Sequence, residues 1–268
     1  CTGKVLQNRH TPDSHSFIGE GKAQEVRMLA EATQSTMVIF DNELSPGNIR
    51  ALEEIIGLPV LDRSALILDI FAQRAKTKEG RLQVELAQYK YLLPRLSGMG
   101  TSLSRQGGGT RGPGETKLES DRRHIRERIN RLEEELEQVR KVRSVQRERR
   151  MKNSVPVVAI VGYTNVGKST LLNTLTQAGV LAEDKLFATL DPTARALELP
   201  DGRKVMLIDT VGLVRRLPHQ LVEAFHSTLE EAASADLILS VCDITSPELL
   251  EQRAVTERLL EELGVEGT

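Results

Sequence analysis

Aromatic residues and cysteines are scarce in this sequence of 268 residues. Aromatic side chains make up 3% of it, tryptophan is absent, and the two cysteines, Cys1 and Cys242, lie far apart. Few aromatic rings argue against a surface that grips single-stranded RNA by stacking on its bases. Two distant cysteines provide neither a disulfide framework nor a zinc-binding pattern, so a reducing cytoplasm is the expected location.

Long apolar runs and an excess of charge of one sign are also missing. No stretch approaches the roughly 20 apolar residues that a membrane-spanning helix needs, and no signal peptide opens the chain. The formal net charge is -2, so any binding to nucleic acid must come from local basic patches. The chain is long enough for two domains. Its first residue is Cys rather than Met, so we expect a fragment of a longer protein.

Residues 1–76 alternate the patterns of short buried strands and amphipathic helices. The apolar run at 36–40 predicts a strand, and Ser45 followed by Pro46 predicts the start of a helix that ends at Gly57. Strand and helix patterns that alternate in this way predict a small α/β domain with parallel strand pairing.

Residues 77–152 have the pattern of a helical hairpin. Apolar residues recur at helical spacing in two stretches, and Val142 and Val145 are expected to extend the second stripe. The glycine-rich loop at 105–117 between them cannot continue a helix. We therefore expect two antiparallel helices that project from the body of the protein, with a kink or an early end of the first helix at Pro94.

The remaining region, residues 153–268, begins with the signature of a phosphate-binding loop. Residues 162–169 read Gly-Tyr-Thr-Asn-Val-Gly-Lys-Ser, between a buried strand pattern and a helix pattern. Backbone N–H groups of such a loop face phosphate oxygens, and the N-terminus of the helix adds partial positive charge. Lys168 would neutralise the β- and γ-phosphates, and the Ser169 hydroxyl would bind Mg²⁺.

Two later segments complete the predicted site. A buried strand pattern ends at Asp209, an expected Mg²⁺ anchor, and Gly212 would offer its N–H to the γ-phosphate. Thr189 lies where a switch loop would reach the metal while the γ-phosphate is present. The candidate catalytic residues are Lys168, Thr189, Asp209 and Gly212, and the candidate Mg²⁺ ligands are Ser169, Thr189 and Asp209. The candidate nucleotide-binding residues are Gly162, Tyr163, Thr164, Asn165, Val166, Gly167, Lys168, Ser169, Thr170, Asp209, Thr210, Val211 and Gly212.

Two positions in these motifs bear on mechanism. Ras-like GTPases place a glutamine directly after the Asp-x-x-Gly motif to orient the attacking water, and here that position is Leu213. We therefore expect hydrolysis to be slow until a partner supplies the missing groups. Asn165 is a candidate to hold a monovalent cation such as K⁺ near the phosphates, although asparagine is also a favoured turn residue.

The base of the nucleotide is not specified by these motifs. An Asn-Lys-x-Asp motif normally reads guanine, and none occurs before the chain ends at Thr268. A chain that ends here is expected to bind nucleotide weakly or not at all, and to lack the activity of the longer protein. The choice of GTP over ATP rests on the resemblance described next.

The chain resembles the HflX family of translational GTPases over essentially its whole length. The resemblance lies in seven blocks at residues 17–22, 40–46, 61–63, 68–75, 82–88, 112–119 and 186–192. It implies a Ras-like P-loop GTPase domain after the hairpin, with GTP or GDP and Mg²⁺ as ligands. It further implies binding to the large ribosomal subunit and its rRNA, and GTP-dependent splitting of stalled or dormant ribosomes.

In that family the hairpin loop points toward the peptidyl-transferase region of the ribosome. The candidate rRNA-contacting residues are Arg105, Arg111, Lys117, Arg122, Arg123 and Arg126. Arginines suit phosphate oxygens, yet the same helix carries glutamates at 133–135 and 137, so a solvated, internally balanced face is an equal alternative. Two other functions stay open: a ribosome-assembly GTPase that checks rRNA maturation, and a protein-interaction switch that uses the hairpin as a coiled coil. We expect a monomer.

Overall fold

The structure is a computed structural model, and it describes residues 1–8, 10–96, 113–152, 155–176, 190, 192–215, 232–262 and 264. It divides into two compact units, residues 1–69 with 88–129 and residues 70–87 with 130–268. This division passes through both helices of the predicted hairpin, and the boundaries at 76 and 152 remain predictions. Among the described residues, no helix is both long enough and apolar enough to cross a bilayer.

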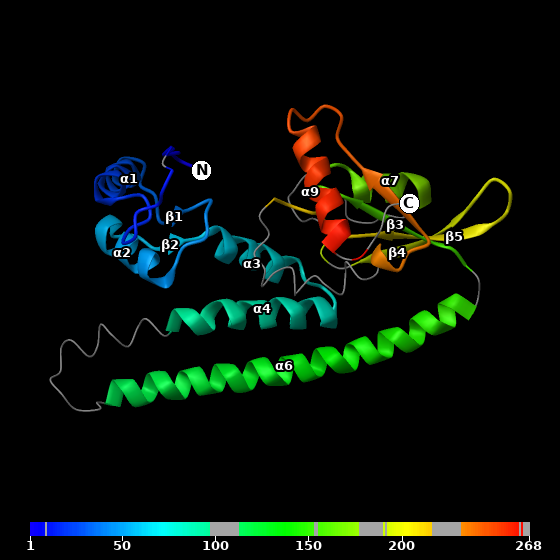
Figure 1. The fold of residues 1–268 in the computed structure, drawn as a ribbon, viewed down its shortest axis with the longest axis horizontal. Helices are drawn as coiled ribbons and strands as arrows, with labels where there is room; N and C mark the ends of the chain where they lie inside the picture. Colours follow the sequence, from blue (N-terminus) through cyan, green and yellow to red (C-terminus); the bar gives the residue numbers. More distant parts are fainter. Residues whose placement is uncertain are drawn as a thin grey trace. The chain divides into compact units, whose positions relative to one another are not determined.

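The first unit contains a small α/β layer, as the sequence predicts (Figure 1). Its elements are α1 (Glu20–Ala32), β1 (Val38–Ile39), α2 (Pro46–Ile56), β2 (Val60–Leu61) and the start of α3 (Arg63–Arg74). Strands β1 and β2 pair in parallel, with Val38 opposite Val60. Helix α2 begins with a capping box: the Asn48 N–H donates to Ser45 Oγ at 3.1 Å, and the Ser45 N–H donates to Asn48 Oδ1 at 3.3 Å. It ends at Gly57, whose φ is 77°.

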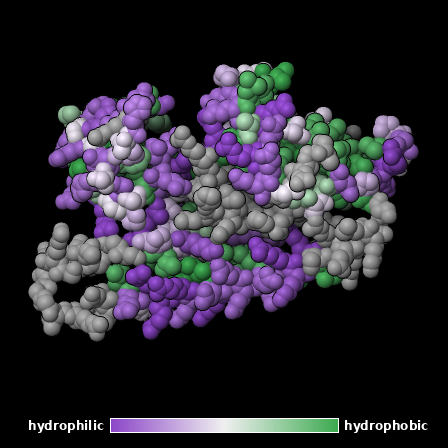
Figure 2. Space-filling view, in the orientation of Figure 1, coloured by the Kyte–Doolittle hydropathy of each residue, from purple (hydrophilic) through white to green (hydrophobic). Residues whose placement is uncertain are grey.

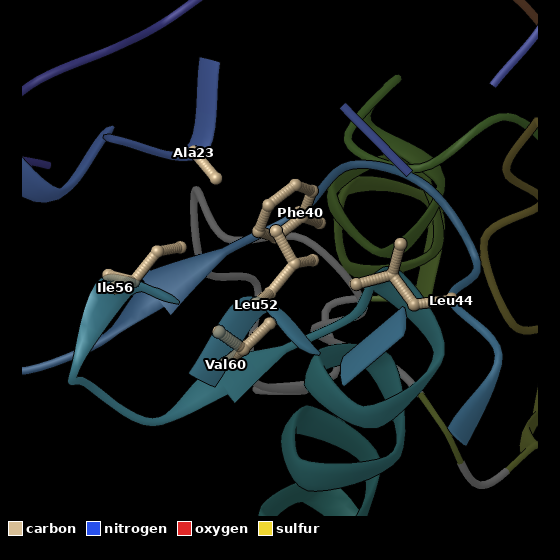
Figure 3. Packing of buried hydrophobic residues seen from close by; sticks show 6 residues of the cluster. All are labelled: Ala23, Phe40, Leu44, Leu52, Ile56 and Val60. Carbon is tan, nitrogen blue, oxygen red and sulfur yellow. The ribbon is translucent and has the colours of Figure 1, made fainter. Parts of the chain in front are cut away.

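The core of this layer lies between α1, α2 and the two strands. Figure 3 shows the side chain of Leu52 between those of Phe40 and Val60. The buried members of this cluster are Ala23, Phe40, Leu44, Leu52, Ile56 and Val60. Burying one leucine of this kind contributes about 1.5–3 kcal/mol, so this cluster contributes several kcal/mol to the stability of the layer.

A buried charged group joins this layer to the end of α4 (Lys78–Leu96). The Asp62 side chain has no exposed surface, and it accepts hydrogen bonds from Tyr91 Oη at 2.8 Å and Arg95 Nη2 at 2.9 Å. It also accepts from the backbone N–H of Ala65 at 2.8 Å and of Leu44 at 3.3 Å. Burial, and then the bond to Asp62, raise the pKa of Tyr91 well above its usual range.

Arg95 completes this group. Its guanidinium donates to the Leu44 carbonyl at 3.2 Å and lies 3.3 Å from the centre of the Tyr91 ring. Pro94 does not end α4, which continues to Leu96. The last turn of α4, which carries Arg95, is therefore fixed against the junction of β2 and α3.

Helices α4 and α6 (Pro113–Lys152) are the two helices of the predicted hairpin. Within the second unit, Leu82 of α4 and Leu132 and Leu136 of α6 are buried. Arg143 forms an ion pair with Glu79 at 3.1 Å, which brings the start of α4 to the later part of α6. This contact is the one expected of the predicted antiparallel pair, in which the start of the first helix meets the later part of the second.

The predicted extension of the apolar stripe along α6 is wrong. Val142 is 60% exposed and Val145 is 50% exposed, so neither side chain belongs to the core. The reason is the length of the partner helix: α4 begins at Lys78, and Glu79 already contacts Arg143. Helical spacing predicts which face a residue occupies, but it does not predict where the covering helix ends.

The second unit holds a four-stranded sheet of the order β4-β5-β3-β6. Its strands are β3 (Val157–Gly162), β4 (Thr193–Glu198), β5 (Lys204–Asp209) and β6 (Leu237–Val241). Strand β3 pairs in parallel with β5 and β6, and β4 pairs with β5 in antiparallel fashion. Helices α7 (Lys168–Thr176) and α9 (Leu249–Glu262) contact this sheet (Figure 1). The predicted Ras-like α/β fold of this region is thereby confirmed.

Candidate nucleotide-binding site

The candidate site lies where β3 and β5 end next to each other. Ile160 of β3 is paired with Asp209 of β5, so the loop that follows β3 lies beside the end of β5. Helix α7 begins at Lys168 directly after this loop. The carboxyl ends of neighbouring parallel strands are the usual place for a ligand in an open α/β sheet.

The backbone of the loop has the tight course that phosphate binding requires. A Cβ atom on Gly162 would lie 2.3 Å from the carbonyl oxygen of Val241 on β6, so no larger residue fits there. Asn165 has a φ of 63°, a left-handed conformation that asparagine adopts more readily than most residues. Asn165 thus acts as a turn residue in the structure. That it also binds a monovalent cation stays a prediction.

Lys168 is buried at the centre of the site. It is 6% exposed, and its Nζ donates to the Tyr163 carbonyl at 2.8 Å. Burial lowers the pKa of Lys168 to about 8, and the negative charge of Asp209 partly opposes this shift. An ammonium group removed from water in this way gains strongly from any phosphate oxygen that reaches it.

Two oxygen-bearing side chains lie beside Lys168. Ser169 Oγ donates to Asp209 Oδ2 at 2.6 Å, and Asp209 has no exposed surface. A hydroxyl and a carboxylate that converge are hard oxygen donors of the kind that Mg²⁺ prefers, and Mg²⁺ usually keeps several waters besides one or two protein ligands. The residues present therefore fit a Mg²⁺ ion.

The segment after β5 runs along the loop rather than away from it. Thr210 donates through its N–H and its hydroxyl to the Ile160 carbonyl, at 3.3 and 2.7 Å. The Leu213 N–H donates to the Gly162 carbonyl at 3.1 Å, and the Thr164 N–H donates to the Leu213 carbonyl at 2.8 Å. Gly212 is thereby placed against Thr164 and Lys168.

The structure thus brings together Lys168, Ser169, Asp209 and Gly212 from the predicted catalytic and metal-binding sets. Thr189, Arg105 and Arg111 lie outside the described residues, and Lys117 lies in α6 with its side chain outside them. Helix α6 carries Arg122, Arg123 and Arg126 within the first unit, whereas the phosphate-binding loop at 162–169 belongs to the second unit. The roles assigned to all these residues remain predictions.

Three family models match consecutive parts of the chain. They are described as GTP-binding GTPase N-terminal, over residues 1–72, GTP-binding GTPase Middle Region, over residues 74–150, and 50S ribosome-binding GTPase, over residues 157–265. The GTPase HflX of Caldanaerobacter subterraneus is 59% identical over 98% of the chain, and that of Escherichia coli K12 is 50% identical over 97%. This chain belongs to the HflX family of GTPases. The predicted resemblance is confirmed.

A solved structure that is similar to this chain covers 97% of its length. That protein, SsGBP in complex with GDP, is 32% identical, with a TM-score of 0.53 over 97% of this chain and 70% of its own. The chain spans 62% of the length of the HflX relative from Caldanaerobacter and 61% of that from Escherichia coli. Membership of the family and the fold are thus established for residues 1–268.

Sequence reasoning missed one contact of this chain, at Arg215. Its Nη1 lies 2.6 Å from Glu251, in the first turn of α9, and its Nη2 lies 3.2 Å from Glu248, which directly precedes that helix. Its backbone N–H donates to Tyr163 Oη at 3.3 Å. The hydrogen bond that the Arg215 side chain donates to Glu251 is the largest cause that raises the pKa of Arg215 above its usual range, and its side-chain hydrogen bond with Tyr163 is the next. No sequence pattern pairs an arginine with glutamates more than 30 positions away, so only the structure reveals this contact.

Replacing Gly212 with alanine should destabilise the second unit and disturb the phosphate-binding loop. The added Cβ would lie 2.7 Å from Thr164 Cγ2 and 2.8 Å from Thr164 Cα, and the backbone atom cannot yield without moving the loop. We expect a loss of about 1–3 kcal/mol in the free energy of unfolding, as for other overpacked sites. Thermal unfolding followed by circular dichroism would measure the loss, and hydrogen exchange at residues 162–164 would locate it.

Gly21 provides the matched control for this substitution. A Cβ atom there meets nothing within 4 Å, and the residue lies in α1. Gly21→Ala should therefore leave stability unchanged or raise it by roughly 0.4–1 kcal/mol. Equal stability of the Gly212 and Gly21 variants would show that the close approach of Gly212 to Thr164 is not a real constraint.

Proposed function

We propose that this chain is the phosphate-binding and ribosome-contacting part of a GTPase that binds the large ribosomal subunit and uses GTP to split stalled or dormant ribosomes. The observation that carries the proposal is the convergence of Lys168, Ser169 and Asp209 around the loop at 162–169. It occurs in a region that matches the model described as 50S ribosome-binding GTPase.

The chemistry follows from the buried groups of the site. Backbone N–H groups of the loop and the ammonium of Lys168 bind the phosphates, and Ser169 and Asp209 hold Mg²⁺, joined by Thr189 while the γ-phosphate is present. When bound, Mg²⁺ neutralises charge that develops on the phosphate oxygens. The proposed location of these steps is the cytoplasm, where ribosomes work.

Hydrolysis is proposed to depend on the ribosome. Leu213 is 2% exposed and its backbone is bonded to the loop at both N–H and carbonyl. An aliphatic side chain cannot orient a water molecule, so the groups that position the nucleophile come from another source. A ribosome that supplies them would couple hydrolysis of GTP to the end of the splitting step.

The proposed contact with rRNA rests on α6. Figure 2 shows hydrophilic residues along this helix. Arg123 and Arg126 are exposed, and among the described residues neither forms an ion pair. By contrast, Arg143 is bonded to Glu79, and Lys141 lies 3.9 Å from Glu137. Two adjacent exposed guanidinium groups without a carboxylate partner are suited to phosphate oxygens of RNA.

We expect the double substitution of Arg123 and Arg126 by glutamate to weaken binding to the large subunit and to abolish splitting. In the intact protein with Mg²⁺, wild type should convert purified ribosomes into subunits with GTP and not with GDP, as seen on sucrose gradients. Loss of two phosphate contacts should make the dependence of log affinity on log salt concentration shallower by about 1.5–2. Arg122 is left unchanged because it is half-buried and its Nε is a buried atom.

The control is an equal change of charge elsewhere. Arg203 and Arg258 are exposed, and their replacement by glutamate alters net charge by the same amount without touching α6. Unchanged binding and splitting in the Arg123 and Arg126 variant would refute the proposed role of α6. Failure of the wild-type protein to split mature ribosomes, with binding only to immature particles, would replace the splitting function by one in ribosome assembly. A salt-independent interaction would point instead to a protein partner of the hairpin.

A further inference from the structure

Thr164, the third residue of the phosphate-binding loop, has a side chain that the fold does not use fully. It is 6% exposed, and its Oγ1 is a buried atom without a hydrogen-bond partner among the described residues. Its backbone N–H is already donated to the carbonyl of Leu213. Buried hydroxyl groups nearly always have a partner in a native protein, so an unbonded one inside a ligand-binding loop points to a ligand.

The methyl group of the same side chain places Thr164 beside Gly212 and the ammonium of Lys168. A Cβ atom on Gly212 would be 2.7 Å from Thr164 Cγ2 and 3.2 Å from Lys168 Nζ, so the threonine and the ammonium lie against the same point of Gly212. Gly212 follows the strand end that carries Asp209. The side chain of Thr164 therefore lies where the phosphate-binding loop meets the segment that follows β5.

The chemistry of the neighbouring groups indicates what would satisfy this hydroxyl. The buried positive charge nearby is the ammonium of Lys168, which attracts an anion, and the loop backbone already serves the inner phosphates. A hydroxyl can donate to an anionic oxygen, and its hydrogen rotates to suit the acceptor. Leu213, the next residue along the facing segment, contributes no polar side chain to compete for that oxygen.

We propose that the Thr164 hydroxyl donates a hydrogen bond to an oxygen of the terminal phosphate of a nucleoside triphosphate and thereby makes the site prefer the triphosphate over the diphosphate. The inference rests on the proposed function, because it presumes a nucleotide on the loop. It assigns a specificity-determining role to a side chain rather than to the loop backbone. The Thr164 methyl group has the separate task of packing against Gly212.

Two substitutions separate the hydroxyl from the methyl group. Thr164→Val keeps a methyl group against Gly212 and removes the hydroxyl, whereas Thr164→Ser keeps the hydroxyl and removes the methyl group. The probes are GDP and a non-hydrolysable GTP analogue, with Mg²⁺, titrated calorimetrically into the intact protein. We expect Thr164→Val to bind the triphosphate analogue about 10- to 100-fold more weakly, as for a lost hydrogen bond to a charged group, with GDP affinity unchanged within about twofold. Thr164→Ser should retain the preference for the triphosphate.

Thermal unfolding without nucleotide distinguishes this role from a merely structural one. If Thr164 were only a structural residue, Thr164→Val would lower the unfolding temperature. Since the hydroxyl has no hydrogen bond to any part of the chain that the structure describes, Thr164→Val should unfold at the same temperature as wild type or a higher one. A lower unfolding temperature together with equal losses of both nucleotides would make Thr164 a structural residue and overturn the inference. Unchanged triphosphate affinity in Thr164→Val would overturn it as well. If the wild-type protein bound neither nucleotide, the proposed function itself would fall.

Discussion

Replacement of Lys168 by methionine is expected to abolish nucleotide binding and, at the same time, to stabilise the nucleotide-free protein. Methionine fills similar space without the ammonium that burial holds at a pKa of about 8, against an ordinary value of 10.5. That shift corresponds to roughly 3 kcal/mol by which the charged form destabilises the fold at neutral pH. Loss of two charge-assisted bonds to phosphate, at about 1.5–3 kcal/mol each, should lower nucleotide affinity at least ~100-fold.

The pH dependence identifies Lys168 as the group responsible. Phosphate binding needs the protonated ammonium, so the affinity of wild type should be full below pH 8 and should fall as the pH rises past that value. For stability the sign is opposite: between pH 8 and 10.5 the unfolded chain binds more protons than the folded one, so this group's contribution to the free energy of unfolding rises with pH. Both dependences should be absent from Lys168→Met.

Lys204 supplies the control for this experiment. It is an exposed lysine at the start of β5, at the opposite end of the strand from Asp209, so Lys204→Met removes a charge without entering the site. Nucleotide titrations between pH 7 and 9.5 and thermal unfolding over the same range would compare the two variants. If Lys168→Met bound nucleotide as tightly as wild type, Lys168 would not be a phosphate-binding residue.

Much of this site could be predicted because its residues follow from local sequence patterns. The glycines of 162–169, the buried strand before them and the helix after them determine the loop almost by themselves. The acid that ends β5 was predictable because parallel strands place their carboxyl ends at one edge, and Ser169 indeed lies 2.6 Å from Asp209. The capping box at Ser45 was equally local.

The remaining features depend on contacts between distant parts of the chain. Arg215 with Glu248, and Asp62 with Tyr91 and Arg95, are separated by roughly 30 residues each, and no periodicity indicates such partners. The exposure of Val142 was missed for a related reason, because the stripe on α6 does not reveal where α4 begins. That the Thr164 hydroxyl lacks a hydrogen-bond partner within the described segments becomes visible only once the neighbours of each atom are known.

Asp62 is the group whose removal should affect the first unit most. It is a fully buried carboxylate that accepts two side-chain bonds, from Tyr91 and Arg95, and two from the backbone. In Asp62→Ala the guanidinium of Arg95 stays in place without its counter-charge, and the two backbone N–H groups lose their acceptor. Breaking one side of a buried ion pair costs about 3–5 kcal/mol, a large part of the stability of a domain this small.

The effect should appear in two measurements. Hydrogen exchange should rise throughout β1, α2 and β2, because the core of the α/β layer loosens with the junction that Asp62 occupies. A spectroscopic titration of the tyrosines should show the pKa of Tyr91 moving down toward its ordinary value, since the bond to Asp62 is one cause of its rise, after burial. Asp62→Asn should cost less than Asp62→Ala, because the amide oxygen can still accept from Tyr91 or a backbone N–H.

Asp121 is the matched control, since it is an exposed aspartate of α6 in the same unit. Its replacement by alanine should change stability by no more than about 0.5 kcal/mol, as for most surface substitutions. If hydrogen exchange in the Asp62 variant were no faster than in the Asp121 variant, the Asp62 carboxylate would not anchor the last turn of α4. Raised exchange in residues 38–61 together with unchanged exchange in the nucleotide-binding loop would instead show that Asp62 supports the first unit independently of the phosphate site.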